Sequence, residues 1–173
     1  REAVRIDPSN AQIWARLARI QTYSSSLLTT DPARLARLTD ALGSIDEAVK
    51  LAPDDSTVHA VRAFVLDWNA NPALVGDKQA QAYLTEAETE AVSALNKDNQ
   101  NTLALAFYAE ILVDQQKWTQ AEQNILQALE REDADQLMDV HRVYAYVLES
   151  LGAYNQAIQE YDKAIAISPN LTF

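Results

Sequence analysis

The prediction of the fold starts from the stretch Gly152–Asn170, GAYNQAIQEYDKAIAISPN. Two alanines lie seven residues apart in it, a proline follows five residues after the second, and an aromatic residue stands three residues before each alanine. These positions are Tyr154, Ala157, Tyr161, Ala164 and Pro169. Spacings of three, four and seven residues place side chains on one face of an α-helix, so an amphipathic helix that ends near the proline is predicted.

The same pattern occurs three more times along the chain. The other copies are Leu38, Ala41, Ile45, Ala48 and Pro53; Leu84, Ala87, Ala91, Ala94 and Asn99; and Trp118, Ala121, Ile125, Ala128 and Asp133. A second pattern precedes each copy: a large residue, a small one four residues later, and usually an apolar one three residues after that. Its members are Trp14, Ala18 and Gln21; His59, Ala63 and Leu66; Leu105, Ala109 and Leu112; and His141, Ala145 and Leu148. Each unit is therefore predicted to be two amphipathic helices in series.

Alanine at the marked positions has a mechanical meaning. Two helices approach within about 8–10 Å only where the side chains at the crossing point are small. The proline or polar stop after the second helix prevents its continuation and lets the chain reverse into the next pair. The pattern therefore favours helix pairs that nest closely and stack into an array.

These residues resemble the tetratricopeptide repeat (TPR), which pairs a first helix rich in large residues with a second helix marked by alanines and ended by proline. The strongest match is HRVYAYVLESLGAYNQAIQEYDKAIAISPN at His141–Asn170, followed by DPSNAQIWARLARI at Asp7–Ile20. The resemblance covers nearly the whole chain. It implies an all-α, right-handed α-solenoid of antiparallel helix pairs, forming a single domain over residues 1–173.

The first two pairs are predicted to be lengthened. The step from the small residue of the first helix to the alanine of the second is 12 residues in the third and fourth copies, but 23 and 24 in the first two. The expected boundaries are a tail of a preceding repeat at 1–8, lengthened repeats at 9–54 and 55–100, and repeats at 101–136 and 137–173. The opening REAVRIDP reads like the end of a helix, so we expect a segment of a longer polypeptide.

Local signals define the two insertions. In the first, a loop is expected at 24–30, then Asp31 as the helix N-cap with Pro32 at the first helical position. In the second, a turn is expected at 71–77, with a helix from Lys78. Insertions of matched length favour packing of the two tips on each other, and a ligand-binding surface is the alternative. The side chains at the tips are Leu27, Leu28, Leu74 and Val75.

The resemblance implies a binding surface as well. In the family, first helices line the concave face of the array, where a peptide or a partner helix lies. The positions that match are Arg19, Phe64, Asp67, Glu110, Arg142 and Tyr146. Phe64 and Tyr146 are either apolar anchors for a ligand or packing residues. Acidic side chains dominate the later part of this face, so the expected partner is a protein or peptide with basic and apolar residues.

Composition limits the other function classes. The 173 residues carry a net charge of -11, which disfavours general binding to nucleic acid or to an anionic membrane. There is no cysteine, so neither a disulfide nor a thiolate site is expected, and the redox compartment is left open. No apolar run approaches the length of a membrane span. A soluble segment is expected, with the cytoplasm favoured.

No pattern indicates catalysis, a cofactor or a metal. Gly43, Gly76 and Gly152 stand alone, so no phosphate-binding glycine motif exists. His59 and His141 are the only histidines, and both occupy the large packing position of a first helix. We therefore expect a non-enzymatic scaffold for protein interactions within a larger protein. The alternative is a regulatory or substrate-positioning module of a larger enzyme, such as a membrane-bound glycosyl transferase or a kinase.

The last predicted helix presents large side chains with no following helix to cover them. They are Ile158, Tyr161 and Ile165. A solenoid needs polar caps at its ends, so further repeats or self-association through the terminal helices is expected.

Overall fold

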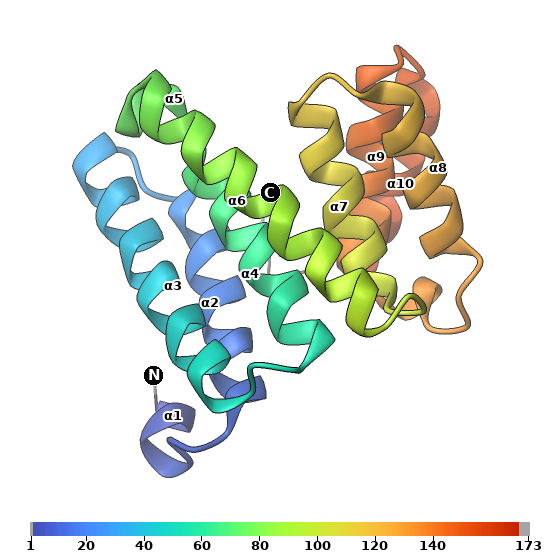
Figure 1. Cartoon of the computed structure of the whole chain (residues 1–173). Coiled ribbons are helices and arrows are strands. Elements are labelled where there is room, and N and C mark those ends of the chain that lie inside the picture. The colour runs from blue at the N-terminus through green and yellow to red at the C-terminus, as the bar shows by residue number, and fades with distance from the viewer. Residues whose placement is uncertain (1, 170–173) are drawn as a thin grey trace.

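The computed structural model describes residues 2–169, which form ten α-helices, one short 3₁₀ helix and no strand (Figure 1). The helices are α1 Glu2–Ile6, α2 Ala11–Ser25, α3 Asp31–Leu51, α4 Ser56–Asn69, α5 Pro72–Val75, α6 Asp77–Lys97, α7 Thr102–Asp114, α8 Trp118–Leu129, α9 Met138–Ser150 and α10 Tyr154–Ile167, with the 3₁₀ helix η1 at Ala134–Gln136. The predicted all-α class is confirmed.

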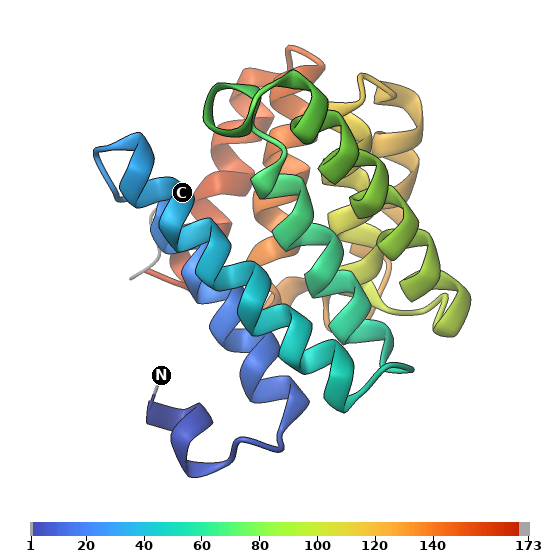
Figure 2. The same cartoon turned by 60° about the vertical axis from the view of Figure 1, so that its left-hand side comes forward.

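The helices form two layers. The first helices of the four pairs, α2, α4, α7 and α9, pack on one another in chain order and make an inner layer. The second helices, α3, α6, α8 and α10, each pack on their own first helix, and the first three of them also pack on the first helix of the next pair (Figure 1, Figure 2). This is the solenoid that the repeated patterns predict.

Three first helices begin with the same kind of cap. The side chains of Asn10, Asp55 and Asn101 accept hydrogen bonds from the backbone N–H groups three residues later, at 3.2, 3.0 and 3.0 Å. Each cap satisfies one of the N–H groups that a helix start leaves without a partner, and is worth about 1 kcal/mol. The caps Asp55 and Asn101 lie two residues after the predicted stops Pro53 and Asn99, so a short segment separates the end of one pair from the start of the next.

The alanine positions lie where helices cross. The small residues of the two patterns are all buried: Ala18, Ala41, Ala48, Ala63, Ala87, Ala94, Ala109, Ala121, Ala128, Ala145, Ala157 and Ala164. Because a methyl group is the largest side chain that such close approach tolerates, these positions set the spacing of the helices.

The predicted lengthening of the first two pairs is also confirmed. Helices α3 and α6 have 21 residues each, against 12 in α8 and 14 in α10. The N-cap of α3 is Thr30 rather than the predicted Asp31, because Thr30 is the last extended residue and Asp31 already lies in the helix. Helix α6 begins at Asp77, one residue before the predicted Lys78. The expected turn at 71–77 contains a short helix, α5.

The tips of the lengthened pairs do not form the expected joint cluster. Leu27 is 61% exposed, and α5 folds back against α6 of its own pair. Figures 1 and 2 show the tip of the α2–α3 pair apart from α5. Matched insertion length alone was therefore a poor guide to contact between the tips.

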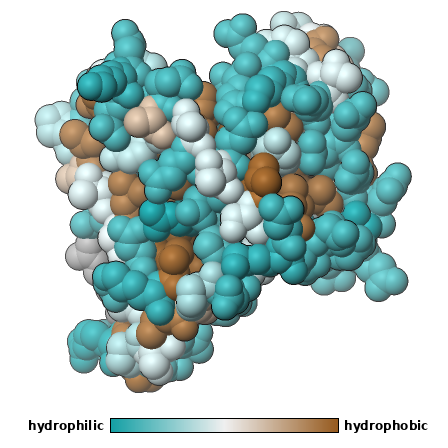
Figure 3. Space-filling view, viewed as in Figure 1, coloured by the Kyte–Doolittle hydropathy of each residue, from teal (hydrophilic) through white to brown (hydrophobic). Residues whose placement is uncertain are grey.

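The outer surface is mostly polar. In the view of Figure 3 hydrophilic side chains predominate, and a hollow at the top separates the side that carries α5 from the side that carries α7. On α10, Ile158 and Ile165 are exposed as predicted, whereas Tyr161 is half-buried. Self-association through the terminal helices stays a prediction.

The turns within the third and fourth pairs have the same hydrogen bonds but different residues at the position of positive φ. Gln116 donates its N–H to the Val113 carbonyl at 2.8 Å with φ of 60°. Gly152 donates its N–H to the Glu149 carbonyl at 3.0 Å with φ of 78°. Only glycine adopts this backbone region without strain, so Gln116 holds a strained conformation that Gly152 avoids.

Gln116→Gly is accordingly expected to stabilise the protein by about 1 kcal/mol, because it removes the left-handed strain of a side-chain-bearing residue. Gly152→Gln is the matched reversal and should destabilise by a similar amount, since a Cβ at Gly152 meets no neighbouring atom and only the φ angle opposes it. Urea unfolding of both variants measures the difference. A loss of stability in Gln116→Gly would contradict the explanation.

Candidate functional site

The inner layer closes on itself through contacts between its first and last helices. Arg19 on α2 forms an ion pair with Asp139 on α9, and the Tyr23 hydroxyl donates to Asp139 Oδ1 at 2.5 Å. Arg19 and Tyr23 are separated from Asp139 by 120 and 116 positions in the sequence. Side chains from the first and last inner helices thus meet across the concave face. At this point the concave face is closed by their contact.

Arg142 on α9 is the centre of this contact. Its guanidinium donates to both carboxylate oxygens of Glu110 on α7, at 2.8 and 2.5 Å, and its Nε donates to the Tyr23 hydroxyl at 3.1 Å. It also lies 5.5–6.0 Å from the ring centres of Tyr23, Phe64 and Trp68. A buried guanidinium that is paired with a carboxylate and surrounded by aromatic rings keeps its charge and fixes the rings in place. We call these five residues the Arg142 cluster.

Aromatic rings fill the space beneath Arg142. Phe64 stacks on Phe107 with ring centres 4.7 Å apart and lies 5.1 Å from the ring of Tyr23. It is fully buried, so it offers no surface to a ligand in this conformation. Of the two alternatives that the sequence left open for Phe64, the structure therefore shows packing.

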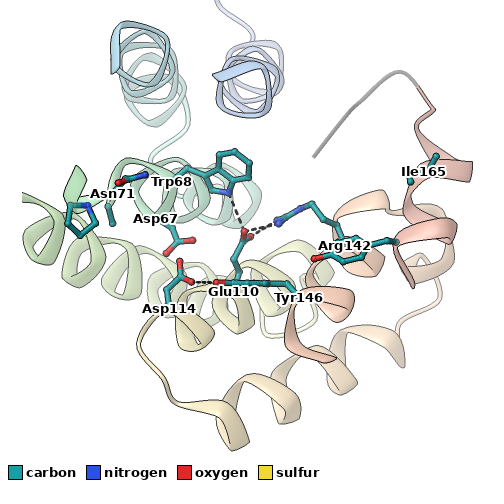
Figure 4. A pocket seen from close by; sticks show the side chains of 11 residues that line it. Asp67, Trp68, Asn71, Glu110, Asp114, Arg142, Tyr146 and Ile165 are labelled. Atoms are coloured by element: carbon teal, nitrogen blue, oxygen red, sulfur yellow. Dashed lines mark hydrogen bonds and ion pairs between the residues drawn. The ribbon is translucent and has the colours of Figure 1, made fainter. Parts of the chain in front are cut away.

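Beside the Arg142 cluster lies a cavity of about 710 Å³ between α4, α7, α9 and α10, which we call the concave pocket (Figure 4). Its walls include Asp67, Trp68, Asp114, Tyr146, Tyr161 and Ile165. Glu110 and Arg142 line it as well. Four of the six residues predicted for the concave face thus meet at one cavity, whereas Arg19 and Phe64 do not line it.

Two carboxyl groups of the pocket have perturbed acidity. Asp67 is 5% exposed, and burial followed by the charges of Asp114 and Glu110 raises its pKa well above the usual value. Asp114 is exposed as a residue, but protein atoms surround its carboxyl group, and this partial loss of water raises its pKa to about 6. The hydrogen bond from the Tyr146 hydroxyl, at 2.6 Å, acts in the opposite direction. Near neutral pH the pair therefore holds a proton that ordinary aspartates would release.

The tyrosines of the pocket act as hydrogen-bond donors. Burial and the neighbouring Asp114 raise the pKa of Tyr146 far above its ordinary value. Burial raises the pKa of Tyr161 to about 12, and its hydroxyl donates to Glu149 at 3.1 Å. Both phenols stay protonated at physiological pH, so they supply O–H groups and ring faces, and neither is an anion.

The histidines lie in helix-packing contacts away from the pocket. His59 Nδ1 lies 2.6 Å from Glu90 Oε2, and His141 Nδ1 lies 2.7 Å from Glu160 Oε2, each on the second helix of the same pair. Across residues 2–169, no group of three or more histidine or acidic side chains is placed to hold a metal ion. No helix within the same range is both long and apolar enough to cross a membrane.

The predicted site did not include Tyr161 and Ile165 on α10, nor three residues on first helices: Tyr23, Trp68 and Asp114. These last three stand five residues after the small residue of a first helix, at Ala18, Ala63 and Ala109. Trp68 had no assigned place; it both packs in the Arg142 cluster, with its Nε1–H donating to Glu110 at 3.2 Å, and lines the pocket. The predicted positions ended four residues after each small residue. Including the fifth would have identified the three residues on first helices.

Comparison with known proteins supports the fold. Neither a protein-family model nor a curated protein matches the sequence. Among solved structures, TTC0263, a thermophilic TPR protein of Thermus thermophilus, is similar with a TM-score of 0.70 and 18% identity, covering 98% of this chain and 79% of that one. PilF of Pseudomonas aeruginosa has a TM-score of 0.56 and 18% identity, covering 95% of this chain and 63% of its own.

The human IFIT1 dimer with PPP-AAAA is also similar, with a TM-score of 0.58 and 18% identity over 95% of this chain. This chain covers 43% of the IFIT1 chain, so it spans less than two thirds of both IFIT1 and PilF. At this level of identity the likeness concerns the fold, and the predicted tetratricopeptide-repeat solenoid is confirmed.

Proposed function

We propose that this tetratricopeptide-repeat fold is a non-catalytic scaffold that binds a peptide segment of a partner protein at the concave pocket. The observation that carries the proposal is the pocket itself: about 710 Å³, walled by aromatic and acidic side chains, on the inner face of the array. Aromatic residues in concave surfaces supply most of the energy of protein interfaces. The surrounding helices hold these side chains in place, so little conformational entropy is lost when a ligand binds.

A short extended segment suits this face better than a partner helix. The Arg19–Asp139 ion pair and the rings of the Arg142 cluster occupy the middle of the inner layer. A helix is about 10 Å wide and would need that space, whereas one or two side chains of an extended peptide fit a single pocket.

The chemistry of the walls indicates the composition of the segment. Three carboxyl groups, those of Asp67, Glu110 and Asp114, line the pocket against the single guanidinium of Arg142, which is already paired with Glu110. Trp68 and Ile165 provide apolar surface next to them. We therefore propose a segment that carries both a basic and an apolar side chain, in keeping with the net charge of -11.

Panning a phage-displayed library of random dodecapeptides on the protein tests the proposal. The enriched peptides are then measured by fluorescence anisotropy against Tyr146→Ala and against Tyr154→Ala, which removes an exposed tyrosine outside the pocket. Tyr146→Ala is expected to weaken binding about tenfold or more, because it removes an aromatic wall worth roughly 1–3 kcal/mol, and Tyr154→Ala should bind like the unmodified protein.

Circular dichroism confirms that both variants are folded, and Tyr146→Phe provides a milder change that keeps the ring. Failure to enrich any peptide would contradict the proposal, as would an equal loss of affinity in the two alanine variants.

A further inference from the structure

We propose that the carboxyl pair of Asp67 and Asp114 anchors one cationic side chain, lysine or arginine, of the bound segment, which displaces a proton that the pair holds in the free protein. The inference rests on the proposed peptide-binding function and adds to it a subsite with a defined charge and a link to pH.

The geometry of the pair provides the first argument. Asp67 comes from α4 and Asp114 from the end of α7, and their carboxyl groups face each other in the pocket (Figure 4). Burial raises the pKa of Asp67 most, and the charge of the neighbouring Asp114 raises it further. Two ionised carboxylates that face each other repel, which favours a proton on one of them. A cationic side chain can take the place of that proton.

An unsatisfied atom provides the second argument. Oδ1 of Asp67 is buried and has no hydrogen-bond partner, and the residue as a whole is 5% exposed. A buried polar atom without a partner is costly, and such atoms are rare unless a ligand or water completes them. An ammonium group has three N–H donors and a guanidinium has five, so either can serve this oxygen and the Asp114 carboxyl together.

The protein's own cations do not fill the site. Arg142 lines the same pocket, and both of its terminal nitrogens bond Glu110. Arg19 pairs with Asp139, and Lys117 pairs with Glu88. Within residues 2–169, neither Asp67 nor Asp114 forms an ion pair with a lysine or arginine. The pair is therefore free to accept a cation from outside.

The walls of the pocket suit the rest of such a side chain. Trp68 and Tyr146 present rings beside the carboxyl pair, and Ile165 lines the far side of the pocket (Figure 4). A cation is attracted to an aromatic face, and the methylene stem of lysine or arginine packs on apolar surface. The same walls would hold norleucine through its stem alone, which makes norleucine the informative comparison.

Burial is the main cause that raises the pKa of both aspartates, and several neighbouring groups add to it or oppose it. Glu110 on α7 raises the pKa of both aspartates, whereas Arg142 on α9 lowers both. Tyr146 on α9 donates to Asp114, Tyr161 on α10 lines the same pocket, and Asp77 on α6 lines a neighbouring cavity with Asp114. With burial as the largest cause, the pKa of Asp114 is raised to about 6.

The proton that Asp114 holds below about pH 6 makes binding depend on pH. A cation that enters releases the proton to solvent, so acid competes with the ligand. A group with a pKa of about 6 is roughly one-tenth ionised at pH 5 and nine-tenths ionised at pH 7. Affinity is therefore expected to rise about tenfold from pH 5 to pH 7.

Two experiments test the subsite. In the first, one of the selected peptides is synthesised with lysine, arginine, norleucine or citrulline at its basic position and measured by anisotropy at pH 5 and pH 7. At pH 7, lysine and arginine are expected to bind about tenfold or more tightly than norleucine and citrulline. Asp114→Asn should remove the pH dependence, and Asp162→Asn, an exposed aspartate on α10 outside the pocket, should not.

The second experiment needs no peptide. The carboxyl ¹³C signals of Asp67 and Asp114 are followed by NMR during titration with n-butylammonium, with n-butanol as the uncharged control. The ammonium is expected to shift both signals and to lower the pH at which they titrate, whereas n-butanol is expected to do neither.

The outcomes separate the two proposals. If peptides bind but lysine and norleucine are equivalent and Asp114→Asn has no effect, the cation subsite is overturned and the peptide-binding function stands. If no peptide binds but n-butylammonium shifts both carboxyl signals, the peptide-binding function is overturned and the cation site is supported for a free amine. If neither experiment shows a response, both proposals fail.

Discussion

Replacing Arg142 with methionine is expected to lower the free energy of unfolding by about 3–5 kcal/mol, because the change leaves Glu110 as a buried carboxylate without its partner. Both residues are 5% exposed, and two hydrogen bonds at 2.8 and 2.5 Å join their side chains. Among residues 2–169, the Trp68 indole N–H, at 3.2 Å, is the donor to Glu110 that would remain. Urea unfolding at pH 7 measures the loss.

A double variant separates the lost partner from the lost packing. Methionine at both Arg142 and Glu110 removes the two charges together and fills the space with apolar chains, which is often neutral for a buried pair. We expect the double variant to be more stable than Arg142→Met by about 2 kcal/mol or more. Arg16→Met, which removes an exposed arginine of the inner-layer helix α2, is the control and should change stability by less than about 0.5 kcal/mol.

If Arg142→Met and Arg16→Met had the same small effect, the ion pair would contribute nothing to the fold. Equal losses in Arg142→Met and in the double variant would instead show that packing of the arginine stem, and not its charge, holds the inner layer together. Both results would contradict the role of the uncompensated carboxylate.

The repeat architecture was predictable because its determinants are local. Small residues at spacings of four and seven decide where helices cross, and Ala63, Ala109 and Ala145 are fully buried at such crossings. Helix starts were predicted less accurately: Asn10 and Asp55 are caps that act within one turn, but the one cap named from the sequence, Asp31, lies one residue inside its helix. Element type and order therefore followed from residues close together in the chain.

The closing of the inner layer was not predictable in this way. The Arg19–Asp139 ion pair joins residues 120 positions apart, and its formation depends on small rotations between successive helix pairs that add up along the array. No spacing in the sequence reports those rotations. The same limit explains why the tips of the lengthened pairs were misjudged, since the direction in which α5 turns decides whether they meet.

The site was predicted in part for related reasons. The resemblance to the tetratricopeptide repeat implied that Asp67, Glu110, Arg142 and Tyr146 share the concave face, and these four line one pocket. It could not show that Glu110 and Arg142 would bond each other, because that depends on how far apart α7 and α9 lie. Their use as ligand contacts remains a prediction.

Phe64→Ala is expected to destabilise the protein by about 3–5 kcal/mol, the range for removal of a fully buried aromatic ring. The Phe64 ring is in contact with Phe107 at 4.7 Å and Tyr23 at 5.1 Å, and the Arg142 guanidinium lies 5.7 Å from its centre. Its loss would leave a cavity under the arginine on which the closing of the inner layer depends. Because a protein has a total stability of roughly 5–15 kcal/mol, Phe64→Leu, with a smaller expected loss, is needed as a folded variant.

Leu27→Ala is the matched control, since it removes a large apolar side chain that is 61% exposed, and it should cost less than about 0.5 kcal/mol. Thermal and urea unfolding give the stabilities, and NMR of the Trp68 indole N–H, which bonds Glu110, reports whether the neighbouring pocket keeps its geometry. We expect this signal to move in Phe64→Leu and to stay in place in Leu27→Ala. Equal stability of the Phe64 and Leu27 variants would show that the inner face is an open trough in solution, with room for a partner helix where the structure places a packed core.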